Sequence, residues 1–251
     1  MHTIHLAGLT FGSGLPKICV PLTAGDLPGL KKELDAARNL PAGLFEWRVD
    51  CFRGDAAPAL GWLKEEAFRP LLVTLRTKGQ GGGAVCGREE YESRLLELLE
   101  LGGFQLLDIE FSWGDSLVSK LIEAAHGKGV GAVVSYHDFE ETPDQPWMVS
   151  LLTRMKALGA DLPKLAVTPG SPRDVLALME ATREASEKLG PVITMSMGEL
   201  GRLSRISGGL TGSCVTFGAG AGGASAPGQI SAARLSELLE EFTPREKGES
   251  L

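Results

Sequence analysis

The chain has 251 residues, of which 43% are apolar, and a formal net charge of −7. This length and apolar content allow one sizeable core and exclude disorder over most of the chain. The negative charge argues against nucleic acid as the main partner, because phosphate binding requires clustered lysine and arginine. It does not exclude a small anionic substrate, which needs only a few local cations.

The ends and the cysteines of the chain indicate a cytoplasmic protein. No apolar run approaches the roughly 18–20 residues of a membrane span, and the first residues lack the basic and apolar segments of a secretory signal. The four cysteines, at positions 19, 51, 86 and 214, are far apart and form no CxxC pair. We therefore expect reduced thiols and neither a zinc site nor a disulfide framework. His2 and His5 have no further candidate ligands beside them.

Eight short apolar or β-branched runs alternate along the chain with longer stretches of helical spacing. The predicted strands are residues 17–22, 44–50, 70–76, 106–111, 130–137, 162–168, 192–197 and 213–218. Nearly continuous apolar strands that alternate with helices are typical of a parallel sheet buried on both faces. Eight such units in about 250 residues predict a single (β/α)8 TIM barrel with an eight-stranded parallel core. A doubly wound open sheet is the alternative. We expect one domain over residues 1–251, with a frayed, charged tail at 243–251.

Two of the intervening segments carry clear helix signals. In residues 88–101, apolar side chains follow the spacing i, i+4, i+7 and i+8 from Tyr91, which places them on one face of a helix. After the sixth predicted strand, Ser171 is followed by proline and then by Asp174, which is the sequence of a capping box. Gly190 and the next proline end that helix.

Polar residues recur in the strands at the positions where a barrel carries its active site, the carboxyl ends of its strands. Lys164 taken alone could be an ordinary strand-start lysine that reaches solvent at the opposite rim, and His137 a hydrogen-bonded structural histidine. The remaining charges could form one ion network that merely holds the barrel together. The convergence of so many on one end favours an active site instead. The polar residues predicted at the carboxyl ends of the strands are Glu46, Arg48, Asp50, Arg76, Asp108, Glu110, His137 and Lys164.

The residue types fit carbonyl chemistry better than other reactions. A lysine in an apolar, cation-rich cavity is disfavoured as an ammonium ion, so its neutral amine can attack a ketone. A histidine can then remove a proton beside the resulting imine and protonate a departing hydroxyl, while arginines hold an anionic substrate. The chain has no GxSxG motif, which argues against a serine hydrolase. The glycine-rich segments 79–83 and 218–223 do not match a phosphate-binding loop.

Seven ordered motifs resemble those of the type I 3-dehydroquinate dehydratase family across nearly the whole chain. They are PKICVPL, EWRVD, TLRTKGQGG, SYHDFEETP, DLPKLAV, MSMGELGRLSRI and SAPGQ. The resemblance implies a (β/α)8 barrel, a homodimer, and neither metal nor organic cofactor. It implies conversion of 3-dehydroquinate to 3-dehydroshikimate, the third step of the shikimate pathway. Net charge and the lack of a long apolar run lead us to expect no nucleic-acid and no membrane partner.

The resemblance also implies roles for individual residues. Lys164 corresponds to the lysine that forms the Schiff base, and His137 to the general acid and base. The expected substrate-binding residues are Arg205, Ser225 and Gln229 for the carboxylate, and Glu46, Arg48 and Arg76 for the ring hydroxyls. Ser225 and Gln229 would belong to a loop that closes over the site.

One position departs from the family pattern. Many members carry a glutamate in the loop after the third strand, where this chain has Gln80. A glutamine can orient an imidazole but cannot carry charge, so we expect other groups to tune His137. Asp108 and Glu110 are expected behind the residues that touch substrate. Two alternatives remain: another class I Schiff-base aldolase-type barrel, and a barrel that binds a ligand without catalysis.

Overall fold

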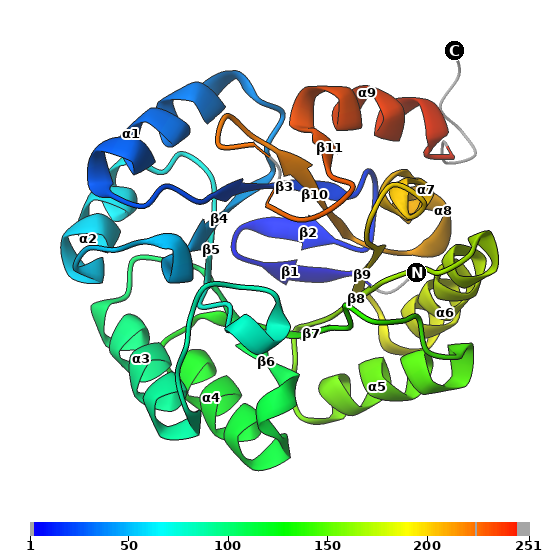
Figure 1. Ribbon diagram of the computed structural model, residues 1–251, viewed down its shortest axis with the longest axis horizontal. Helices are drawn as coiled ribbons and strands as arrows, with labels where there is room; N and C mark the ends of the chain where they lie inside the picture. Colours follow the sequence, from blue (N-terminus) through cyan, green and yellow to red (C-terminus); the bar gives the residue numbers. More distant parts are fainter. Residues whose placement is uncertain (1–2, 224, 245–251) are drawn as a thin grey trace.

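Parallel strands curve round a common axis in this computed structural model, which describes residues 3–223 and 225–244, and helices pack outside them (Figure 1). The eight strands of the barrel are β3 (Lys17–Leu22), β4 (Leu44–Arg48), β5 (Leu71–Thr74), β6 (Leu106–Glu110), β7 (Gly131–His137), β8 (Leu162–Val167), β9 (Ile193–Ser196) and β10 (Val215–Ala219). The sheet order is β11-β10-β3-β4-β5-β6-β7-β8-β9, where β11 (Ile230–Ser231) is a short addition beside β10. The barrel closes between β9 and β10 through a bridge of Val192 and Ser213, next to a hydrogen bond from Cys214 N to Val192 O of 2.8 Å.

The helices that cover the barrel follow the strands in chain order. They are α1 (Leu27–Ala36), α2 (Ala56–Glu66), α3 (Arg88–Leu101), α4 (Asp115–Gly127), α5 (Gln145–Ala157), α6 (Pro172–Leu189), α7 (Arg202–Ile206), α8 (Gly208–Thr211) and α9 (Ala232–Phe242). Within residues 3–223 and 225–244, no helix is both long and apolar enough to cross a membrane.

The predicted barrel and its eight strands are confirmed, with strand ends that differ by no more than three residues from the expected ones. Helix α3 has the predicted bounds and buries the predicted face that begins at Tyr91. Helix α6 begins with the capping box of Ser171 and Asp174 and ends at Gly190, whose φ of 86° favours glycine. The prediction that Asp50 lies in the strand is wrong, because β4 ends two residues earlier and Asp50 lies in a 3-10 turn.

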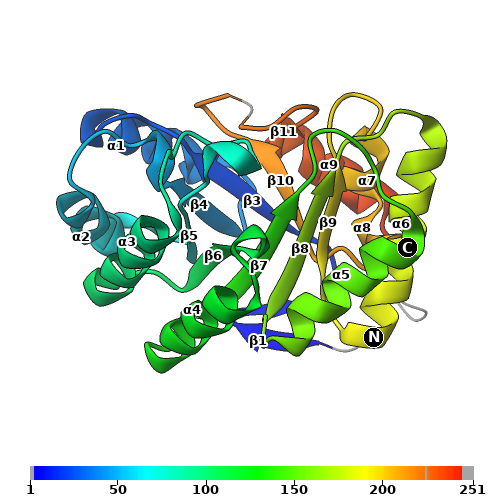
Figure 2. The same cartoon turned by 60° about the horizontal axis from the view of Figure 1, so that its bottom comes forward.

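A hairpin that the sequence analysis did not foresee closes the amino-terminal end of the barrel. Strands β1 (Ile4–Leu6) and β2 (Leu9–Phe11) pair antiparallel and pack against the residues inside the barrel. Figure 2 shows the hairpin at the end opposite the loop that leads from β10 to β11. A Cβ atom on Gly131 would lie 2.7 Å from Leu6, so only glycine at the start of β7 leaves room for the hairpin. The predictions for His2 and for residues 245–251 concern residues outside the described ones.

Candidate active site

The interior of the barrel is layered, with apolar residues below and polar residues above. Each strand directs alternate residues inward, and the lower inward positions form one apolar cluster that includes Leu44, Leu72, Leu106, Val133 and Leu162. Two residues further along these strands stand Glu46, Thr74, Asp108, Ser135 and Lys164, all buried. The parallel register pairs Thr74 with Asp108 and Ser135 with Lys164. The sequence period of two therefore concentrates polar groups at the carboxyl end of the barrel.

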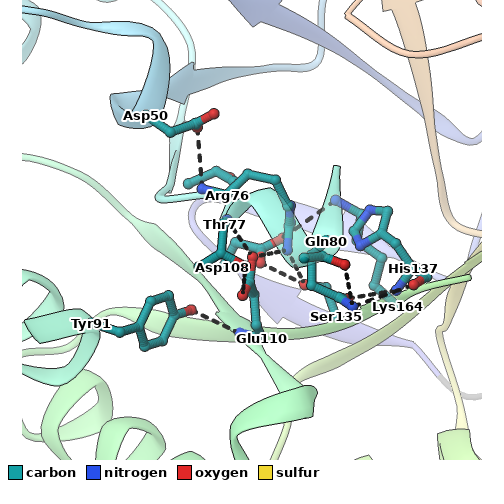
Figure 3. A network of polar contacts seen from close by, with 12 residues as sticks. Asp50, Arg76, Thr77, Gln80, Tyr91, Asp108, Glu110, Ser135, His137 and Lys164 are labelled. Atoms are coloured by element: carbon teal, nitrogen blue, oxygen red, sulfur yellow. Dashed lines mark hydrogen bonds and ion pairs between the residues drawn. The ribbon is translucent and has the colours of Figure 1, made fainter. Parts of the chain in front are cut away.

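Arg76 and two carboxylates of β6 form the centre of this polar layer (Figure 3). Arg76 Nη2 lies 2.7 Å from Asp108 Oδ2, and Nη1 lies 3.2 Å from Glu110 Oε1. Burial alone would raise the pKa of Asp108, but the charges of Arg76 and Lys164 and a hydrogen bond from Ser135 hold it below its usual range. Arg76 thus lies between the two carboxylates, as the burial of ionic groups requires.

Lys164 is 3% exposed and lies between a carboxylate and an aromatic ring. Its Nζ atom is 3.3 Å from Asp108 Oδ2 and 4.4 Å from the centre of the Phe217 ring. The alternative of a solvent-reaching strand-start lysine is therefore wrong. The expectation of an apolar, cation-rich cavity needs correction as well, since the charged atom in contact with the amine is an anion. Both contacts stabilise a positive charge on this nitrogen.

His137 is the last residue of β7, beside the same layer. The pKa of its imidazole is lowered well below 6.5 by burial and by the charges of Arg76, Lys164 and Arg48. Nδ1 is buried and has no hydrogen-bond partner among the described residues. The ring of Phe139 stacks nearly parallel to the imidazole, with 6.2 Å between ring centres. A neutral imidazole at neutral pH is the form that accepts a proton.

Gln80 contacts the backbone of His137 and not its ring. Its Oε1 accepts the backbone N–H of His137 at 2.8 Å, and its Nε2 donates to the carbonyl of the same residue at 3.3 Å. Gln80 comes from a short 3-10 turn, Lys78–Gln80, in the loop after β5. The side chain therefore fixes the end of β7 relative to this loop.

The two charged residues of β4 lie in different surroundings. Glu46 is buried and accepts the hydroxyl of Thr74 at 2.8 Å. Arg48 donates to Asp50 through Nε at 2.8 Å and Nη2 at 2.7 Å. Burial would raise the pKa of Asp50, but Arg48 holds it below its usual value. Asp50 also accepts the backbone N–H of Arg76 at 3.1 Å, and so joins the turn after β4 to the loop after β5.

A second cluster combines Arg205 of α7 with residues 225–229, which we call the lid loop. Arg205 is 1% exposed, and its Nη2 donates to the carbonyl of Pro227 at 2.9 Å. Its Nε is buried and has no partner within the part of the chain that the structure describes, and burial lowers its pKa to about 10. Gln229 accepts the backbone N–H of Ser225 at 2.9 Å and donates to its hydroxyl at 3.0 Å. A buried cation without a carboxylate is suited to bind an anion.

The structure brings most of the predicted residues together in two groups, whereas Glu46 and Arg48 bond to Thr74 and Asp50. Arg76, Asp108, Glu110 and Lys164 share one ion network, with Gln80 and His137 beside it, while Arg205, Ser225 and Gln229 meet at the lid loop. The sequence analysis assigned no role to Ser135, which bonds both Arg76 and Asp108, or to Phe217. Ser135 could have been found, because it lies two residues before His137 and so faces inward as well.

The barrel carries a buried lysine at the carboxyl end of its strands. It also carries a buried arginine that has no carboxylate partner among the described residues. These features define a (β/α)8-barrel enzyme that acts on a small molecule. The family model for type I 3-dehydroquinase matches residues 18–244 of this chain, and the chain therefore belongs to this family.

The relatives support the assignment over the full length. A 3-dehydroquinate dehydratase of Listeria monocytogenes serotype 4b (strain F2365) is 42% identical, with 96% of this chain and 98% of the relative covered. The crystal structure of a type I 3-dehydroquinate dehydratase from Clostridium difficile superposes with a TM-score of 0.90 at 37% identity, covering 96% of this chain and 98% of that one. The enzyme of Geobacillus kaustophilus HTA426 gives a TM-score of 0.88 at 32% identity, with 96% of each chain covered.

Proposed function

We propose that this protein dehydrates 3-dehydroquinate to 3-dehydroshikimate through an imine on Lys164. Membership of the family supports the reaction. The single structural observation that carries the mechanism is a buried lysine whose Nζ is held among inward-facing polar groups at the carboxyl end of the barrel. A buried primary amine is the nucleophile that forms an imine with a ketone.

The proposed steps use only protein groups and water. The ammonium group of Lys164 releases a proton, and the resulting amine nitrogen forms a bond to the ketone carbon of the ring. The ketone oxygen leaves as water with the two protons lost from the nitrogen, which becomes an iminium. His137 then removes a proton from the adjacent carbon, and the electron pair moves to the nitrogen as an enamine. The enamine expels the ring hydroxyl, which takes a proton from His137 and leaves as water. A water molecule finally hydrolyses the conjugated iminium, which releases the product ketone and Lys164. The net change is the loss of one water.

Each group of the site has a task in this scheme. Burial and the neighbouring cations keep the pKa of His137 low, so the imidazole is ready as a base. Arg205 binds the substrate carboxylate with Ser225 and Gln229, because its guanidinium is buried and has no ionic partner among residues 3–223 and 225–244. Glu46, Arg48 and Arg76 face the ring hydroxyls. Arg76 is already bonded to Asp108 and Glu110, so it contributes to substrate binding mainly as a fixed charge.

Trapping the imine tests the proposal directly. The protein is mixed with 3-dehydroquinate, reduced with borohydride and analysed by intact mass and peptide mapping. We expect an adduct on the peptide that contains Lys164, absent in Lys164→Ala, together with conversion of the substrate. Conversion without an adduct would contradict the imine mechanism. No adduct and no conversion would contradict the proposed function and favour a binding protein, and cleavage of a phosphorylated ketose would favour an aldolase.

The remaining proposals concern the setting of the reaction. We propose a single catalytic domain that acts in the cytoplasm as a homodimer, at the third step of the shikimate pathway. Light scattering of the purified protein tests the dimer, and a mass equal to one chain would contradict it.

A further inference from the structure

We propose that Asp108 is the counter-ion of the charged nitrogen on Lys164 throughout the imine stages, and that Ser135 positions it for this role. The inference rests on the proposed function and adds to it a reason why two carboxylates of β6, Asp108 and Glu110, are not equivalent.

The two carboxylate oxygens of Asp108 have different partners (Figure 3). Oδ1 accepts the hydroxyl of Ser135 at 2.6 Å. Oδ2 lies 2.7 Å from Arg76 Nη2 and 3.3 Å from Lys164 Nζ. Ser135 is itself held, because its hydroxyl oxygen accepts a hydrogen bond from Arg76 Nη1 at 2.9 Å. The hydroxyl thereby fixes the rotation of the carboxylate, and the other oxygen is left facing the amine.

The charge on the nitrogen explains why such a partner is needed. An ammonium ion and a ketone combine to an iminium ion and water, so the positive charge on Lys164 is the same before and after imine formation. The charge is absent in the neutral amine that attacks the ketone, in the carbinolamine that this attack forms and in the enamine, and it returns when the hydroxyl leaves. A carboxylate fixed beside the nitrogen stabilises both iminium ions, and it favours the expulsion step that regenerates the charge.

The balance of buried charges points the same way. Asp108, Glu110, Arg76 and Lys164 are each 3% exposed or less, and together they carry two negative and two positive charges while the nitrogen is cationic. A neutral Asp108 would leave the cation on Lys164 buried without its ionic partner, which is costly. On the far side of the nitrogen, the ring of Phe217 supplies a weaker attraction.

Glu110 supplies the matched control. It also pairs with Arg76, but its other bonds go to the backbone N–H and hydroxyl of Thr77, at 2.8 and 2.7 Å, and not to Lys164. Asp108→Asn and Glu110→Gln therefore remove the same charge from the same strand and the same arginine. Only the first removes an ionic contact of the reacting nitrogen.

The experiment measures the fraction of protein trapped by borohydride at saturating 3-dehydroquinate, with kcat and KM, for the wild type and both variants. We expect Asp108→Asn to lower the trapped fraction and kcat by about 10- to 100-fold, the range for loss of a charged hydrogen-bond partner. Glu110→Gln should change the trapped fraction by less than about threefold, since its lost interactions lie on Arg76 and Thr77. Ser135→Ala retains every charge and should give an intermediate loss. Thermal unfolding of each variant shows whether it is folded.

Each outcome decides one question. Equal losses in the Asp108 and Glu110 variants would show a general need for buried negative charge and would overturn the inference, as would a trapped fraction in Asp108→Asn equal to that of the wild type. If Asp108→Asn does not fold, Ser135→Ala decides, and an unchanged trapped fraction there overturns the proposal. If the wild type itself forms no adduct and no product, it is the proposed function that fails.

Discussion

The amide of Gln80 pairs with both backbone groups of His137: Oε1 accepts the N–H at 2.8 Å, and Nε2 donates to the carbonyl at 3.3 Å. Only a side chain that is at once donor and acceptor can make both bonds, and a carboxylate cannot make the second. The residue that departs from the family pattern therefore fits its surroundings in this chain. It holds the backbone of His137 and leaves the pKa of the ring to burial and to neighbouring cations.

A carboxylate at position 80 should change the acidity of the histidine. In Gln80→Glu, a negative charge beside His137 favours the imidazolium and raises its pKa. Protonation of the imidazole abolishes the base, so the acidic limb of the pH profile of kcat/KM should move to higher pH. In the control Gln105→Glu, the carboxylate can still accept the N–H of Leu71, as Gln105 does at 2.8 Å, far from the histidine. An unchanged profile in Gln80→Glu would show that position 80 does not tune His137.

The sequence predicted most of the fold because periodicity and capping are local signals. Helix α3 and the capping box of α6 follow from residues a few positions apart, and they appear with the expected ends. The β1–β2 hairpin was not foreseen, because its strands are only three residues long and their apolar residues are buried by the barrel and not by each other.

The candidate site was predicted in its residue types but not in its pairings. Strand period alone places Asp108 and Lys164 on the inner face, yet it does not reveal that they touch across two intervening strand pairings, β6 with β7 and β7 with β8. For the same reason the sequence suggested a cation-rich cavity round the lysine. Arg76 is close, but its charge is turned toward Asp108 and Glu110.

The low pKa of His137 should also make the free energy of unfolding depend on pH. The unfolded histidine takes up a proton near its ordinary pKa of 6.5, while the folded one stays neutral to lower pH. The unfolded state then binds more protons, so stability is fully present above pH 6.5 and falls below it, by at most about 1.4 kcal/mol per pH unit. His137→Gln should reduce this fall in the free energy of unfolding, measured with urea between about pH 5 and 7. His5→Gln, at an exposed position of the β1–β2 hairpin, is the control. Identical pH dependence in His137→Gln and the wild type would contradict the assigned pKa.

Arg205 should contribute to affinity more than to turnover. Its Nε has no partner in the described part of the chain, and burial lowers its pKa to about 10, so the guanidinium is suited to bind an anion. Arg205→Gln should raise KM by about 100-fold, because a forked, charged contact to a carboxylate is lost. Arg202→Gln is the matched control, since Arg202 lies on the same helix, is exposed and pairs with Glu199 at 3.1 Å. Steady-state kinetics on both variants provide the measurement. Equal KM values in the two variants would show that Arg205 does not bind the substrate.

Closure of the lid loop should require a residue without a side chain, glycine, at position 228. This residue has a φ of +75°, and a Cβ atom on it would overlap the carbonyl oxygen of Gly198, whose own N–H donates to Pro227 O at 3.2 Å. Gly223 precedes the lid loop, also has a positive φ, of +89°, and has nothing within 4 Å of an added Cβ. Alanine at either position carries a similar conformational cost, about 1–2 kcal/mol, but only Gly228→Ala prevents the loop from docking.

The two alanine variants therefore separate closure from backbone strain. We expect kcat/KM to fall more than about tenfold in Gly228→Ala and less than about threefold in Gly223→Ala, because an open lid leaves the site accessible to water and Arg205 without its contact to Pro227. Borohydride trapping with substrate, on the same samples, shows whether the loss arises before or after the imine. Equal losses in the two variants would mean that positive φ alone matters, and that docking of residues 225–229 against Gly198 has no part in catalysis.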